Sequence, residues 1–334
     1  MKPFNHSNHF NSLQIMKKSI FAFAAALAAL VACNKNDVAP MQPQNHESLV
    51  SCELTVGICG AMTKATAVTT ENEAKVNNLQ IFVFRGDDLD AYSSVDNAME
   101  ATLSCTAGER EVYALVNAPD YSSVPGKAAL LAKVSELSAN SLTNFEMVGS
   151  KSVTLPQASS VSVDVNRIAA RVVIKQITRK FSSAALQALD FSVDAIYLIN
   201  VAGNTSNDLT AAPAAWYNVA KNNDELPALL HDSPIGSITD GSSYSKPHTF
   251  YGYPNDLSAK TTRLVVETTL GSTKYYYPIN MPQMESNKSY EIAELVITRP
   301  GSDDPDVPVS FADATFSINV IDWAVVPVTE GTTI

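Results

Sequence analysis

The sequence predicts an all-β protein built from two β-sandwiches in tandem. Many short runs alternate apolar and polar residues, turn-forming residues separate these runs at short intervals, and helical periodicity is rare. A chain of 334 residues is long enough for two such domains. We place the boundary so that the N-terminal sandwich covers residues 48–165 and the C-terminal sandwich covers residues 166–334.

A short apolar segment precedes the predicted sandwiches. Two lysines lead into an uncharged apolar run that ends in Leu-Val-Ala-Cys33. This is the pattern of a secretory signal with a lipoprotein cleavage motif, and the run is shorter than the roughly 20 residues that span a bilayer. We expect residues 1–32 to be removed, translation to start at Met16, and an acylated Cys33 to hold the polar tether 33–47 at a membrane outside the cytoplasm. The alternative is an ordinary secretory signal in which Cys33 is incidental.

The first predicted strand covers residues 49–59 and alternates strictly. Period-two alternation indicates a strand with one buried face. The apolar positions of this strand are Val50, Cys52, Leu54, Val56 and Ile58. Further elements of the N-terminal half are predicted as strands over 79–84, 111–116, 148–155 and 161–165 and as an amphipathic helix over 127–137.

The longest clean alternation opens the C-terminal half, over residues 166–177. Its apolar residues share one face, and its cationic residues Arg167, Arg171 and Lys175 share the other. Residues 202–247 are rich in glycine and proline and are predicted to be mostly loop. Further elements are predicted as a short helix over 182–189 and as strands over 191–200, 262–270, 274–279 and 289–298.

A last strand is predicted over residues 315–328, beyond a linker rich in proline and aspartate. A strand this long at a chain end needs a partner. Its apolar positions are Phe316, Ile318, Val320, Ala324, Val326 and Val328.

Composition and motifs disfavour several classes of function. The chain has 23 Lys and Arg against 34 Asp and Glu, a net charge of −11, which repels nucleic acid. The histidines do not stand at metal-ligand spacing, and neither a nucleophile elbow nor a phosphate-binding loop occurs. We therefore expect no enzyme, no metal and no cofactor. We interpret Cys52, Cys59 and Cys105 as small buried apolar residues, because an odd number of thiols argues against a disulfide framework.

The order of these features resembles the major fimbrial subunit family, the fimbrillins of type V pili. The resemblance covers nearly the whole chain after the signal and depends on order and spacing more than on any single motif. It is carried by the cleavage motif at Cys33, the first strand followed by an isolated Lys64, the stretch 142–155, the strand 163–177 with Arg167, and the tail from Tyr290 with its Asp322-Trp323 pair.

This resemblance implies two transthyretin-like sandwiches and assembly by strand exchange. A lipid-anchored precursor at the outer membrane would be cut by a trypsin-like protease between Lys64 and Ala65, or after Lys75. The first strand would leave with the lipid, and the C-terminal strand of another copy or a related subunit would replace it in an extracellular fimbrium that supports adhesion. Lys64 stands where the best-known members have arginine, which leaves the protease open. The alternatives are a surface lipoprotein that binds glycans without polymerising and an adhesin at a pilus tip.

Overall fold

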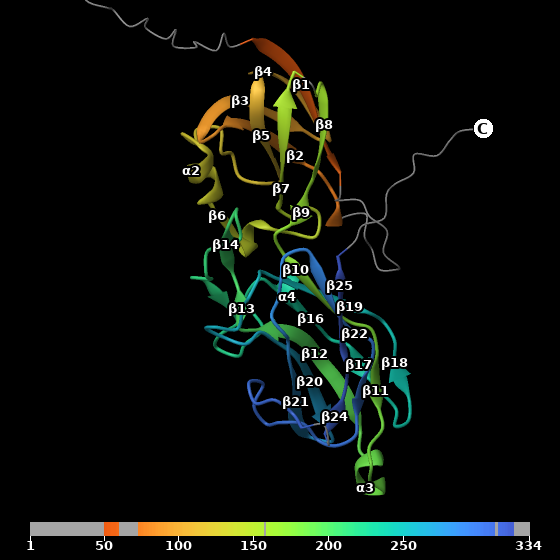
Figure 1. The fold of residues 1–334 in the computed structure, drawn as a ribbon. Coiled ribbons are helices and arrows are strands. Elements are labelled where there is room, and N and C mark those ends of the chain that lie inside the picture. Colours follow the sequence, from red (N-terminus) through yellow and green to blue (C-terminus); the bar gives the residue numbers. More distant parts are fainter. Residues whose placement is uncertain (1–49, 60–72, 157, 311–312, 324–334) are drawn as a thin grey trace, which may run out of the picture. The chain divides into compact units, whose positions relative to one another are not determined.

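The computed structural model describes residues 50–59, 73–156, 158–310 and 313–323 (Figure 1). The predicted signal, Cys33 with its tether, the Lys64–Ala65 bond and residues 324–334 lie outside the described residues. Strands dominate the described part, which confirms the predicted all-β class. Residues 48–334 form one unit by their contacts, so the boundary at residue 166 stays a prediction.

Two sheets pack face to face in the N-terminal half. The larger has the order β3-β2-β5-β7-β9 and the smaller the order β4-β1-β8. Leu54 and Val56 of the smaller sheet share one apolar cluster with Ile81 and Val112 of the larger, as in a β-sandwich. The strands are β1 (Ser51–Cys59), β2 (Asn78–Arg85), β3 (Asp88–Asp96), β4 (Glu100–Thr106), β5 (Gly108–Val116), β7 (Met147–Leu155), β8 (Ser160–Asp164) and β9 (Asn166–Arg167).

The helix predicted over 127–137 is wrong in its second half. Helix α2 (Lys127–Leu131) places Leu130 against Phe82 and Phe84 on the outer face of the larger sheet. The chain then becomes extended as β6 (Val134–Glu136), which pairs with β14 (Asn204–Ser206), and closes in a 3-10 turn, η1 (Leu137–Ala139). Pairing with a distant strand therefore overrides the local helical spacing.

Three further sheets form the C-terminal half, with the orders β19-β10-β22-β25, β18-β11-β23-β24 and β16-β12-β20-β21. Strand β17 also pairs with β12 of the last sheet. A two-stranded sheet of β13 and β15 accompanies them. The strands are β10 (Ala170–Ile174), β11 (Ile177–Arg179), β12 (Phe191–Ile199), β13 (Val201–Ala202), β15 (Trp216–Tyr217), β16 (His231–Asp232), β17 (Gly236–Ser237), β18 (Ser243–Tyr244), β19 (His248–Gly252), β20 (Arg263–Leu270), β21 (Thr273–Asn280), β22 (Lys288–Ile292), β23 (Leu295–Ile297), β24 (Ala314–Thr315) and β25 (Ile318–Asp322). The short helices are α3 (Ala184–Gln187) and α4 (Pro227–Leu230).

The segment 166–177 is not the single strand that its alternation predicts. It is divided into β9, β10 and the start of β11, and all five residues of β10 are buried. Arg167 and Arg171 were expected on a polar face but are only 1% and 5% exposed. All five residues of β10 are buried although successive side chains point to opposite faces, so both faces of β10 are covered. Arg167 belongs to β9, which pairs with β7.

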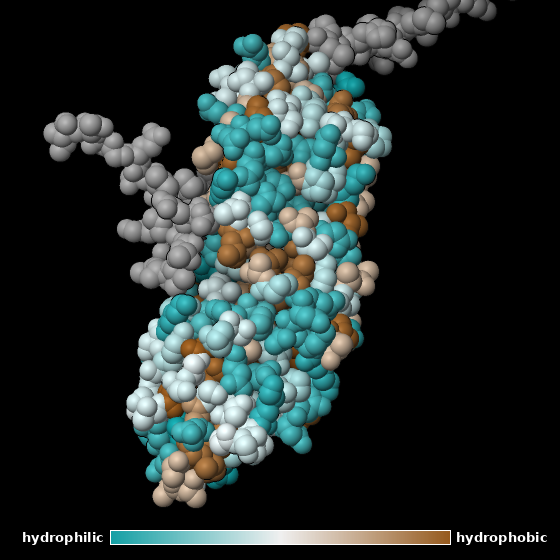
Figure 2. Space-filling view, turned by 180° about the vertical axis from the view of Figure 1, so that it is seen from behind, coloured by the Kyte–Doolittle hydropathy of each residue, from teal (hydrophilic) through white to brown (hydrophobic). Residues whose placement is uncertain are grey.

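The surface is mainly polar. Figure 2 shows hydrophilic residues over most of one face, with apolar residues gathered in a small group near the middle of the view. Single exposed apolar side chains are common on soluble domains, but two neighbours on one edge strand, Val320 and Ile321, are 51% and 42% exposed. Within the described ranges, no helix has the length and apolarity needed to cross a membrane.

Candidate assembly site

Strand β1 lies between two neighbours (Figure 1). It pairs antiparallel with β4, from Ser51↔Thr106 to Gly57↔Glu100, and it pairs parallel with β8 at its other edge. Both edges of β1 are therefore hydrogen-bonded. Removal of this strand would leave a slot with one unpaired backbone edge on each side.

The inward face of β1 is part of the core. Leu54 and Val56 are fully buried, and Ile58 is 6% exposed. Three apolar side chains buried to this extent contribute roughly 5 to 9 kcal/mol, at about 1.5 to 3 kcal/mol each. Cys52 is only partly buried. Val50 lies before the strand and is 55% exposed, so the prediction that Val50 lies on the buried face is wrong.

The outward face of β1 is polar and also paired. The hydroxyls of Thr55 and the facing Thr102 of β4 lie 2.9 Å apart and form a hydrogen bond. The strand therefore has the one-sided character that its alternation predicts. A replacement strand would need the same period and the same face inward.

Glu73 follows β1 along the chain and occupies the centre of a buried charged cluster. Glu73 is only 4% exposed. Oε2 accepts hydrogen bonds from Arg171 Nη1 at 3.2 Å and from Trp323 Nε1 at 3.0 Å, and Oε1 accepts one from the Tyr251 hydroxyl at 2.5 Å. The Glu73 carbonyl accepts another from Arg167 Nε at 3.0 Å. We call these five residues the Glu73 cluster.

The charges of the Glu73 cluster depend on one another. Burial lowers the pKa of Arg167 to about 10, while the nearby Glu73 carboxylate raises it and so opposes the effect. Arg167 therefore stays protonated at neutral pH. Burial and then Glu73 raise the pKa of the Tyr251 hydroxyl, which therefore remains a donor. The Arg167 guanidinium also lies 4.5 Å from the centre of the Trp323 ring, a cation–π contact.

The C-terminal segment is docked on its own chain as far as Trp323. Strand β25 forms the edge of a sheet and pairs antiparallel with β22, from Lys288↔Asp322 to Ile292↔Ile318. Trp323, at 1% exposed, follows it into the Glu73 cluster. The predicted strand over 315–328 is therefore interrupted after β24 and again at Trp323, where the indole turns inward.

The predicted donor residues separate into three groups. Phe316 and Ile318 are partly buried against the core, while Val320 is more than half exposed. Ala324, Val326 and Val328 lie outside the described residues. The structure thus brings Trp323 of this segment to Glu73, the first residue described beyond the predicted cleavage bond.

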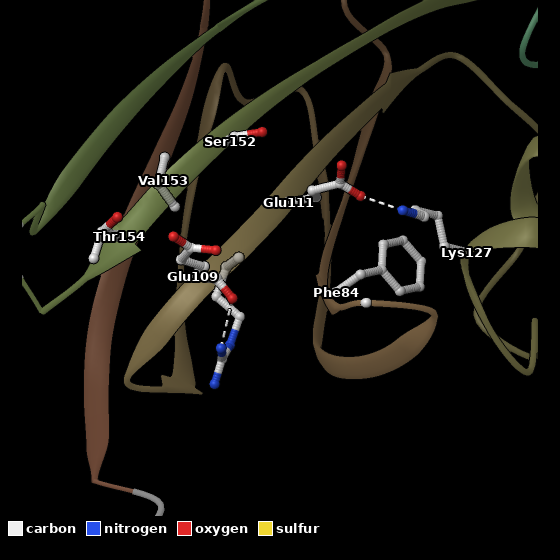
Figure 3. A pocket seen from close by; sticks show the side chains of 9 residues that line it. Phe84, Glu109, Glu111, Lys127, Ser152, Val153 and Thr154 are labelled. Carbon is white, nitrogen blue, oxygen red and sulfur yellow. Dashed lines mark hydrogen bonds and ion pairs between the residues drawn. The ribbon is translucent and has the colours of Figure 1, made fainter.

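A hollow of about 510 Å³ lies over β5 and β7 (Figure 3). The figure shows Glu111 directed at Lys127, with which it forms an ion pair. Arg110 is held by Asp90, with Nε 2.8 Å from Oδ2. The described part of the chain contains no group of three potential metal ligands.

Comparison with known proteins identifies relatives among fimbrial proteins. Residues 53–174 match the family model of the major fimbrial subunit protein (FimA). The major fimbrium subunit FimC of Porphyromonas gingivalis is 27% identical over 290 residues, which cover 78% of this chain and 60% of that protein. The chain thus spans about 60% of the length of the relative FimC. The major fimbrium subunit FimA type-2 of the same species is 23% identical over 93% of this chain and 98% of its own length.

Solved structures agree on the fold. A fimbrilin (fimA) from Porphyromonas gingivalis superimposes with a TM-score of 0.61 at 16% identity, over 82% of this chain and 98% of the other. The C-terminally truncated tip fimbrial protein Mfa3 from that species gives 0.52 at 13% identity, over 82% of this chain and all of the other. The predicted resemblance to the major fimbrial subunits is confirmed, and the all-β fold is that of a fimbrilin.

Proposed function

We propose that this chain is a structural subunit of a cell-surface fimbrium, and not an enzyme. It is exported as a lipoprotein, held at the outer membrane through Cys33, cut after Lys64, and polymerised when the C-terminal segment of a neighbour replaces β1. The observation that carries the proposal is the place of β1 between β4 and β8, with Leu54 and Val56 fully buried. Removal of such a strand opens an apolar slot with two unpaired edges, and a strand from another subunit fits this chemistry. A head-to-tail contact of this kind does not close and produces a filament.

The cost of losing β1 explains why cleavage and replacement would be coupled. The loss of its buried side chains alone, roughly 5 to 9 kcal/mol, is comparable to the whole stability of a typical domain, about 5 to 15 kcal/mol. A cut subunit therefore retains β1 until a competing strand arrives or a strong force removes it. This favours assembly at sites where donor segments are concentrated.

The Glu73 cluster favours Lys64 over Lys75 as the cleavage site. A cut after Lys75 would separate Glu73 from the body of the subunit and remove the carboxylate nearest to the buried Arg171, at 3.2 Å. The Lys75 carbonyl also accepts a hydrogen bond from Asn117 Nδ2 at 2.8 Å, which holds that bond against the fold. A cut after Lys64 leaves these contacts intact.

The test is protease treatment of the purified precursor, followed by amino-terminal sequencing and electron microscopy. We expect a new amino end at Ala65 and filaments only after the cut. Lys64→Gln should block both, while the matched control Lys75→Gln should change neither. Monomers that persist after complete cleavage in the presence of a reductant would refute the polymerising subunit.

One observation favours a second candidate function, a surface lipoprotein or tip adhesin that does not polymerise. Strand β25 already pairs with β22, and Trp323 is buried in its own chain. A subunit whose C-terminal segment stays docked cannot donate the residues up to Trp323 to a neighbour. Removal of residues 324–334 separates the two functions, because it abolishes filaments of a polymerising subunit and leaves a non-polymerising one unchanged.

A further inference from the structure

Two cysteines face each other across the pairing of β1 with β4. Cys52 and Cys105 are directly opposite in the antiparallel register, and their Sγ atoms lie 4.0 Å apart. Ala107 N donates to Val50 O at 2.9 Å, which marks a hydrogen-bonded pair two residues before Cys52. Because such pairs alternate, Cys52 and Cys105 also form a hydrogen-bonded pair, with Cα atoms about 5.5 Å apart. That separation is within the roughly 4.4 to 6.8 Å that a disulfide requires.

We propose that Cys52 and Cys105 form a disulfide in the exported protein and that this bond fastens β1 to β4. The predicted signal takes the chain out of the cytoplasm, to compartments where disulfides persist. Closure needs a shift of about 2 Å between the two sulfur atoms, from 4.0 Å to the roughly 2.05 Å of a disulfide, which side-chain rotation supplies.

The reaction is a thiol–disulfide exchange with an oxidised dithiol partner. The Cys52 thiolate attacks one sulfur of the partner's disulfide, and the other partner sulfur leaves with the electron pair. The Cys105 sulfur, after losing its proton, then attacks Cys52 Sγ and displaces the partner. The two cysteines lose two protons and two electrons in total, and the partner's disulfide becomes two thiols.

The environments of the two thiols set the order of these steps. Cys52 is partly exposed, whereas Cys105 is 3% exposed. Burial, and next the adjacent Cys52 sulfur, raise the pKa of Cys105 to about 12. Cys105 is therefore protonated at neutral pH, and Cys52 is the thiol that meets the oxidant first.

The bond would control release of β1, a consequence that rests on the proposed function. Cys52 lies before the proposed cut at Lys64, and Cys105 lies after it. Once the loop is cut, the disulfide is the covalent link that still holds β1, and the lipid with it, to the subunit. Reduction would then be required before a donor strand could enter.

The bond itself is tested by peptide mapping of the full precursor after exposure to oxidised glutathione. Alkylation and tryptic digestion without reduction should give the peptide 36–64 joined to the peptide 86–110, and this product should disappear on reduction. Cys59→Ser should retain the link and Cys105→Ser should lose it, because 36–64 also contains Cys59. Recovery of Cys52 and Cys105 as separately alkylated peptides from the oxidised precursor would overturn the site.

The role in release is tested on the cut protein. Under denaturing conditions without reductant, the fragment that ends at Lys64 should remain attached in the oxidised wild type and separate in Cys105→Ser. Filaments should form at least tenfold faster from cut wild type after reduction than before it. Equal rates would overturn the control of release. If reduced wild type and the Cys52→Ser/Cys105→Ser variant both fail to form filaments, the proposed fimbrial assembly fails, while the mapped disulfide stands.

Discussion

Substitution of Glu73 by alanine should detach the C-terminal segment from its own subunit. The carboxylate of Glu73 binds Arg171, Trp323 and Tyr251 at once. Alanine removes the acceptor for all three donors and leaves the Arg171 charge in the interior. The indole of Trp323 then loses its hydrogen-bond partner, and the end of β25 loses its anchor.

The magnitude follows from the burial of the ion pair. The side chains of Arg171 and Glu73 are only 6% and 4% exposed, so water screens their interaction little. Removal of one partner of such a pair costs about 3 to 5 kcal/mol. Arg171 retains Ser289 Oγ at 3.1 Å and Glu291 at 3.9 Å, which places the expected loss at the lower end, about 3 kcal/mol.

The assay combines urea unfolding with the fluorescence of Trp323. A Trp216→Phe background leaves Trp323 as the single tryptophan of the chain, because the sequence has two. Glu73→Ala should lower the free energy of unfolding by about 3 kcal/mol and shift the native emission to longer wavelength as the indole meets water. The matched control is Asp322→Asn, at the end of β25 beside Trp323. It removes the ion pair between Asp322 and Lys288, in which the Asp322 side chain is 81% exposed. It should therefore change the free energy of unfolding by less than about 1 kcal/mol.

A destabilisation by Glu73→Ala no larger than that of the Asp322→Asn control would refute the role of the Glu73 carboxylate. A loss of stability with unchanged native emission of Trp323 would refute the anchoring of the segment by Glu73, because the indole would then be held by packing alone.

Two further predictions concern the core. Burial raises the pKa of Glu146 to about 7, against an ordinary value of 4.5, so its folded state favours the protonated form. The contribution of protonated Glu146 to the free energy of unfolding is fully present below about pH 4.5 and is lost as pH rises through about 7. The total loss is on the order of 3 kcal/mol. Urea unfolding at pH 5 and pH 8 should show this loss in wild type, and Glu146→Gln should reduce it; an equal loss in both would exclude Glu146 as its source. Leu54→Ala should lower the free energy of unfolding by about 2 to 5 kcal/mol through the cavity it leaves, and the control Val50→Ala, at an exposed position, by less than about 0.5 kcal/mol. A small effect of Leu54→Ala would show that β1 is not held by its buried side chains.

Strict alternation made β1 predictable from the sequence. Leu54, Val56 and Ile58 occupy the buried face as expected, because a strand in a sandwich has one dry side. Strand β4 has the same signal in Ala101, Leu103 and Cys105, all buried, but it was not among the predicted strands. Strand β3 has no such signal, because it is a sheet edge whose residues are mostly half-buried or exposed.

The Glu73 cluster could not be located from periodicity, because its members come from distant segments of the chain. A weaker signal was present in Arg167 and Arg171, which stand within an otherwise apolar run. An arginine buried between two strands requires an acidic partner, so this run indicates that a buried carboxylate exists. It does not indicate which carboxylate this is. Glu73 precedes Arg167 by 94 positions and Arg171 by 98 positions. Only the fold brings them together.

The docking of Trp323 determines which residues could replace β1 in a neighbour. A donor drawn from residues 324–334 alone has predicted apolar positions that include Ala324, which fills less space than Leu54 or Ile58. A donor that also used Phe316 and Ile318 would match the slot better, yet β25 would first have to separate from β22 and from Glu73. The two routes predict different effects of Glu73→Ala on filament growth from cut subunits. If β25 must undock, the variant should elongate faster than wild type, because the contact that holds the segment is already lost. If only residues 324–334 are donated, the rate should stay unchanged although the subunit is less stable. Time-resolved light scattering with electron microscopy on both proteins distinguishes these outcomes, and slower growth would refute both routes.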